Sequence, residues 1–188
     1  MPRYSPFIDG LLSDSSLLQK LRPTESENPG AAIRIREATD SELTGGREIT
    51  SETLFPLVRG GLFYALDAID ESYRIARQIG DDTGSYWHGM IHRREGDFDN
   101  ARALYEEVLR HKPNDPRILM SLGHILKTTG RLEEGVDMYR RSITVRPELG
   151  ESWWSLANLK TYRFSDADVP AMQAALDAAF PDAAGMFE

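Results

Sequence analysis

The sequence contains an internal repeat with a period of 34 residues. Four identities recur at this spacing, namely Gly89 with Gly123, Gly96 with Gly130, Tyr105 with Tyr139, and Pro113 with Pro147. A third copy opens in the same register, with Trp153 in the place of Leu119. A fixed period of this length indicates a repeat architecture, in which each copy is one supersecondary unit that buries its apolar face against its neighbours.

Each copy has the pattern of a helix pair. The expected helices cover residues 82–95, 98–111, 116–129 and 132–145. Glycines separate the two helices of a pair and prolines follow the second one, because proline cannot continue a helix. Apolar residues recur at intervals of three and four, as in Leu119, Leu122 and Leu126. Small residues at matching positions predict close approach of paired helices, with Gly89, Gly123 and Ala157 facing Ala101 and Gly135.

These copies resemble the tetratricopeptide repeat (TPR). The family pattern has an aromatic residue, then Leu-Gly, later Ala-x-x-x-Phe, and a proline. The second copy matches it with Leu119, Leu122-Gly123, Leu126, Gly135, Tyr139 and Pro147, and the first with His88-Gly89, His92, Ala101, Tyr105 and Pro113. Ser85 replaces the opening aromatic of the first copy, and Phe164 stands where the third should have its turn glycine. The spacing Ser165-x-x-Asp168 then predicts a capping box that starts a last helix, at about 166–180.

The resemblance implies an all-α fold: a short right-handed α-solenoid of about three helix-turn-helix TPR-like repeats, with an N-terminal helix and a C-terminal capping helix. The expected repeat domain covers residues 82–180 and divides into 82–115, 116–149 and 150–180, before a tail at 181–188. Residues 51–81 form an N-terminal packing helix, at about 54–79, in which Gly60 and Gly61 could introduce a bend. Residues 1–50 are expected to be an arm, partly disordered or loosely packed, with a short helix at 15–21 and an alternating segment at 32–35.

A narrower likeness concerns residues 116–166. The runs 122–131 and 154–166 are similar to the repeat region that precedes the catalytic domain of bacterial TPR sulfotransferases. Those enzymes hold their sulfate donor with a Gly-rich phosphate loop after a strand, and this sequence has no such loop. The likeness therefore implies shared repeats without the catalytic domain, and leaves open that the chain is a docking region related to such an enzyme.

Composition excludes several classes of protein. The chain has 30 acidic and 22 basic residues and a net charge of -8, which is the wrong sign for a general nucleic-acid binder. The absence of cysteine excludes disulfides and thiolate metal sites. There is neither a signal-peptide apolar region nor a run of 18 apolar residues, so we expect a cytoplasmic protein without membrane contact.

One group of residues has the spacing of a metal site. His88, His92 and Glu95 stand at i, i+4 and i+7 of one predicted helix. The repeat register places both histidines where the second copy has Leu122 and Leu126, so packed histidines are the preferred interpretation. We therefore predict no metal, no cofactor and no enzymatic activity. The alternative is a metal-dependent enzyme that uses His88 and His92.

The predicted function is protein-protein interaction, with a peptide or partner protein bound in the concave groove of the repeats. The register predicts that the first helix of each pair lines this groove, with the residues Tyr86, Met90, Arg93, Arg94, Met120, His124, Lys127, Trp154, Asn158 and Tyr162. This aromatic and basic set favours a ligand with an acidic group and a hydrophobic anchor. Because one residue is about 100° of helix rotation, Trp153 should be core and Trp154 should face the groove. The identity of the partner and the oligomeric state stay open.

Overall fold

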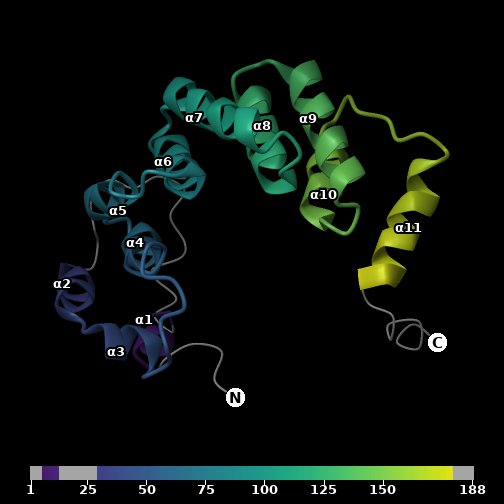
Figure 1. The fold of residues 1–188 in the computed structure, drawn as a ribbon. Coiled ribbons are helices and arrows are strands. Elements are labelled where there is room, and N and C mark those ends of the chain that lie inside the picture. Colours follow the sequence, from purple (N-terminus) through teal and green to yellow (C-terminus); the bar gives the residue numbers. More distant parts are fainter. Residues whose placement is uncertain (1–5, 13–28, 180–188) are drawn as a thin grey trace. The chain divides into compact units, whose positions relative to one another are not determined.

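The structure, a computed structural model, describes residues 6–12 and 29–179 (Figure 1). All regular elements in these two ranges are helices, which confirms the predicted all-α class. The chain divides into two compact units, residues 1–104 and 105–188, and the division falls within the helix that spans residues 98–111. We describe each unit separately.

The four helices of the first two copies lie where the repeat predicts them. They are α6 (Asp82–Glu95), α7 (Phe98–His111), α8 (Pro116–Thr128) and α9 (Leu132–Val145). Gly96 and Gly130 both have φ of 83°, the left-handed conformation that glycine adopts without steric cost. Aspartates begin the first helix of each pair, since the side chains of Asp81 and Asp115 accept hydrogen bonds from backbone N–H groups at the start of α6 and α8.

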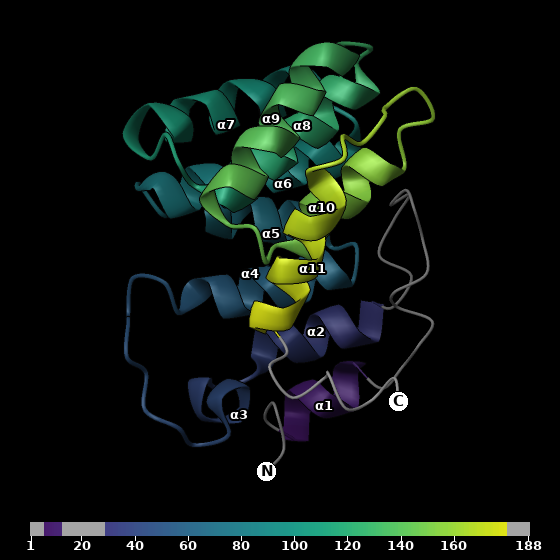
Figure 2. The same cartoon turned by 90° about the vertical axis from the view of Figure 1, so that its right-hand side faces the viewer.

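In the second unit, α8 and α9 lie side by side (Figure 2). A Cβ atom added at Gly123 would lie 2.7 Å from the ring of Tyr139, and one added at Gly135 would lie 3.1 Å from the carbonyl oxygen of Gly123. The predicted close approach of Gly123 and Gly135 is therefore confirmed, because neither position has room for a larger side chain.

The third copy consists of α10 (Gly150–Ala157) and α11 (Asp168–Ala179). The carboxylate of Asp168 accepts hydrogen bonds from the backbone N–H of Ser165 at 2.7 Å and from its hydroxyl at 3.0 Å. This is one half of the predicted capping box, because the Asp168 N–H donates to the carbonyl of Ser165 and not to its hydroxyl. Arg140 of α9 donates two further hydrogen bonds to the same carboxylate, at 2.6 and 2.8 Å. The first turn of α11 is thus tied to α9.

In the first unit, the prediction of a single helix at 54–79 is wrong. The structure has two helices, α4 (Pro56–Ala65) and α5 (Ile69–Ala76). The chain turns at Asp67, whose φ is 58°, and not at Gly60 or Gly61. The Ala68 N–H donates to the Phe63 carbonyl at 2.9 Å and the Asp67 N–H donates to the Tyr64 carbonyl at 3.2 Å, which is the Schellman pattern of a helix end.

The described part of the N-terminal arm is packed, whereas the sequence predicted an arm that is partly disordered or loosely packed. It forms α1 (Pro6–Leu12), α2 (Pro29–Glu37) and α3 (Asp40–Thr44), so residues 32–35 are helical. Ile35 is fully buried in a cluster that also contains Leu43 and Phe63. Arg59 of α4 donates a hydrogen bond to the carbonyl of Ala38 at 2.8 Å. The predicted helix at 15–21 lies outside the described residues.

Candidate functional site

The two adjacent tryptophans of α10 have opposite surroundings. Trp153 is 8% exposed, packs in a core cluster with Leu156, and donates its indole N–H to the carbonyl of Pro147 at 2.9 Å. Trp154 is 67% exposed. The prediction that one ring is core and the other is not is therefore confirmed. An exposed ring of this size is an anchor that a partner could cover.

A part-buried hydrogen bond connects α10 to α8. His124 Nε2 lies 3.0 Å from the hydroxyl of Ser155, the residue after Trp154. One turn further along each helix come Lys127 and Asn158, both exposed. We call Lys127, Trp154 and Asn158, with His124 between the helices, the α8/α10 surface, because the repeat register predicts that they face one groove. The set combines an aromatic ring, a cation and an amide.

Two residues predicted to line the groove, Met120 and Tyr162, instead pack against other side chains of the second unit. Met120 is only 8% exposed and belongs to the core cluster around Trp153, which corrects its expected place on a ligand surface. The ring of Tyr162 packs edge-on against Phe164, with centroids 5.2 Å apart, and the guanidinium of Arg140 lies 5.2 Å from its centre. Neither side chain is free for a ligand.

The remaining groove candidates lie on α6, in the first unit. Tyr86, Met90 and Arg93 are half-buried. Arg94 is bound to the carboxylate of Asp67, and its guanidinium lies 5.0 Å from the centre of the Tyr64 ring. Its charge is therefore already paired within this unit.

The two histidines of α6 pack against each other and against one tyrosine. The ring centres of His88 and His92 are 4.6 Å apart, and Tyr73 of α5 meets them edge-on at 4.7 and 5.9 Å. Burial, with help from the neighbouring His92 and Arg77, lowers the pKa of His88 and keeps that ring neutral. His92 Nδ1 lies 3.2 Å from a carboxylate oxygen of Asp97. Packed histidines are the arrangement that the register favoured.

No group of three or more His, Asp or Glu side chains in residues 6–12 and 29–179 is arranged to hold a metal ion. Nor does any helix in this part of the chain have the length and apolar character needed to cross a membrane.

Sequence reasoning missed Arg140 of α9, which contacts Asp168, Trp153 and Tyr162 of the third copy. Its guanidinium holds the pKa of the Asp168 carboxyl well below the usual range, chiefly through their hydrogen bonds. The periodicity of α9 assigns Arg140 to the polar side of its helix. Its partner lies 28 residues away, so no local pattern indicated the contact.

Comparison with known proteins supports the repeat assignment. Residues 92–158 match the family model described as tetratricopeptide repeat. A segment of 69 residues is 30% identical to the peroxisomal targeting signal receptor of Saccharomyces cerevisiae. This match covers 37% of the chain and 11% of the receptor, so the chain spans a small part of its curated relative. Neither match is to a sulfotransferase, and the likeness of residues 116–166 to that class stays a prediction.

The matched segment includes the whole of α7, α8, α9 and α10, and so both helices of the α8/α10 surface. Tetratricopeptide repeats are in general modules that bind other proteins along the surfaces of their stacked helices. This segment is thus similar to repeats whose general role is protein-protein interaction.

Proposed function

We propose that the protein binds a peptide segment of a partner protein, and that the α8/α10 surface forms one of its contacts. The observation that carries this proposal is Trp154, a large aromatic ring that is two-thirds exposed beside a buried tryptophan. Leaving such a ring in water forgoes the free energy of its burial, which a partner can recover. Hot spots of interfaces are enriched in tryptophan for this reason.

The charge that the repeat register assigns to the same groove as Trp154 indicates the chemistry of the ligand. Lys127 is the cation of the α8/α10 surface, and it is exposed. The chain as a whole has a net charge of -8, so its general field would attract basic peptides. The local prediction is the opposite one: a hydrophobic side chain packs on Trp154 while an acidic group of the same peptide pairs with Lys127.

The relative supports the class of ligand only. It is named as a receptor for a peroxisomal targeting signal, and the shared segment is short. For this chain we propose peptide recognition by repeats, with no commitment to a targeting signal. The groove residues predicted on α6, Tyr86, Met90 and Arg93, are proposed as peptide contacts of the first unit by itself.

The test is a binding comparison on immobilised full-length protein. One peptide library has a central Leu, Phe or Trp flanked by Asp and Glu, and the matched library has Lys and Arg at the flanking positions. We expect tighter binding of the acidic library, and loss of most of that binding in Trp154→Ala and Lys127→Gln. Arg141→Gln, on α9, is the charge control and should bind normally. Tighter binding of the basic library, or unchanged binding by Trp154→Ala, would reject the proposal.

A further inference from the structure

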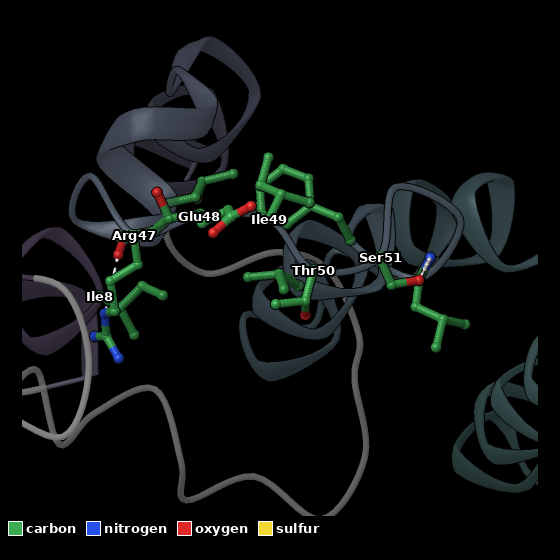
Figure 3. A pocket seen from close by; sticks show the side chains of 11 residues that line it. Ile8, Arg47, Glu48, Ile49, Thr50 and Ser51 are labelled. Atoms are coloured by element: carbon green, nitrogen blue, oxygen red, sulfur yellow. Dashed lines mark hydrogen bonds between the residues drawn. The ribbon is translucent and has the colours of Figure 1, made fainter.

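The first unit contains a pocket that the repeat pattern does not explain. It has a volume of about 470 Å³ and is open to solvent (Figure 3). Its walls come from α1, α3, the connection after α3 and the start of α4, through the residues Ile8, Leu43, Thr44, Arg47, Glu48, Ile49, Thr50, Ser51, Leu54, Phe55 and Val58. Small-molecule sites in proteins have volumes of roughly 300–1,000 Å³, so this pocket is large enough for such a ligand.

Most of the lining is apolar. Ile8 and Leu43 are buried in the core of the unit and form its inner wall. Leu54 and Val58 are respectively 40% and 38% exposed and line the same pocket. Exposed apolar side chains that stand singly need no explanation, but two that share one concave surface give it the character of a binding site.

One cation at the pocket is held in place and has unused donors. The Nε of Arg47 donates to the carbonyl of Thr44 at 3.2 Å, which fixes the base of the guanidinium. Its two terminal nitrogens have no acceptor in the described part of the chain. Figure 3 shows Arg47 and Ile8 at one end of the pocket and Ser51 toward the other. A guanidinium with a free fork is suited to a carboxylate, which it binds through two parallel hydrogen bonds.

We propose that this pocket binds a small amphipathic carboxylate, with its apolar chain against Leu43, Leu54 and Val58 and its head group on Arg47. The site lies in the first unit and is independent of the peptide-binding proposal. Glu48, the neighbour of Arg47, also lines the pocket and repels an anion, so it lowers the affinity of the pocket for a carboxylate. Substitution of Glu48 therefore tests the assigned charge of the ligand.

Titration calorimetry of the full-length protein with decanoate tests the proposal. We expect saturable binding of one molecule per chain, weakened about tenfold or more in Arg47→Gln, because a charge-assisted hydrogen bond would be lost. Val58→Asp should abolish binding, since it places a charge on the apolar wall at an exposed position that the fold tolerates. Glu48→Gln should bind decanoate more tightly. Arg74→Gln, at an exposed arginine of α5 away from the pocket, is the control and should bind like the parent.

Three outcomes would overturn the proposal. They are the absence of saturable binding, equal effects of Arg47→Gln and Arg74→Gln, and tighter binding of decylamine than of decanoate. Circular dichroism of each variant shows whether the helices are kept, so that a loss of binding is read only from folded protein. Failure of this site leaves the α8/α10 surface untouched, because the two tests use different variants and different ligands.

Discussion

Arg94 of α6 binds the carboxylate of Asp67, the residue at which the chain turns between α4 and α5. Asp67 has a φ of 58°, in the left-handed region that favours glycine. The ion pair connects this turn to the first repeat helix, through a side chain that lies 27 residues further along the chain.

Two substitutions at Asp67 separate the ion pair from the backbone strain. Both Asp67→Gly and Asp67→Ala remove the carboxylate, but only alanine keeps a Cβ atom in the left-handed conformation. We expect Asp67→Ala to be less stable than Asp67→Gly by about 1 kcal/mol, and both to be less stable than the parent. Urea unfolding measures these differences. Equal stability of the two variants would show that the strain is negligible.

Two isoleucines of α2 test whether the N-terminal arm belongs to the core. Ile35 is fully buried and Ile33 is 46% exposed on the same helix. We expect Ile35→Ala to lower the free energy of unfolding by about 2–5 kcal/mol, because it opens a cavity. Ile33→Ala, the matched control, should change it by less than about 0.5 kcal/mol. A small effect of Ile35→Ala, measured by thermal and urea unfolding, would contradict the packed arm.

The close approach of α8 and α9 predicts that Gly123→Ala is destabilising although alanine is the better helix former. The added methyl group would lie 2.7 Å from the Tyr139 ring, so the helices must move apart at a cost of about 1–3 kcal/mol. Gly150→Ala is the control, because nothing lies within 4 Å of a Cβ atom there. Its unfolding free energy should stay within about 0.5 kcal/mol of the parent. A stabilised Gly123→Ala protein would argue against the contact.

The Arg140–Asp168 pair predicts a specific dependence of stability on pH. Because the folded-state pKa of Asp168 is lowered, the charged carboxylate stabilises the folded state above about pH 4, the usual range of an aspartate. That contribution declines as the pH falls toward the folded-state pKa. The difference in unfolding free energy between the parent and Asp168→Asn should therefore be largest at neutral pH and shrink below about pH 4. A difference that is constant from pH 7 to pH 2 would contradict this role.

The adjacent tryptophans should respond differently to truncation. Trp153→Ala removes a buried ring and should cost about 3–5 kcal/mol of unfolding free energy. Trp154→Ala removes an exposed ring and should change the melting temperature little, corresponding to about 0.5 kcal/mol or less. Differential scanning calorimetry of both variants provides the measurement. Comparable destabilisation by the two changes would mean that Trp154 is also core.

The regular part of the fold could be predicted from the sequence because its signals are local. Gly96 and Gly130 end helices in the left-handed conformation, and Pro113 and Pro147 exclude a continued helix. The different roles of Trp153 and Trp154 followed from helical rotation alone. Each of these inferences needs only neighbouring residues.

The parts that could not be predicted depend on partners distant in sequence. The break between α4 and α5 occurs at Asp67. The local pattern instead favoured a bend at Gly60 and Gly61, which lie within α4. Arg140 and Asp168 meet only once α11 has packed against the preceding repeat. Met120 has the register of a surface residue and is buried because a large neighbour, Trp153, packs in the same cluster. Long-range packing decided these positions against the local pattern.

The contrast between Trp153 and Trp154 allows intrinsic tryptophan fluorescence to report on ligand binding and on folding separately. A buried indole emits at shorter wavelengths and is shielded from dissolved quenchers, whereas an exposed one is quenched and shifts when a ligand covers it. With Trp87 and Trp153 replaced by phenylalanine, the remaining indole would signal occupation of the α8/α10 surface without any attached dye. With Trp87 and Trp154 replaced instead, the same spectrometer would follow the integrity of the third repeat.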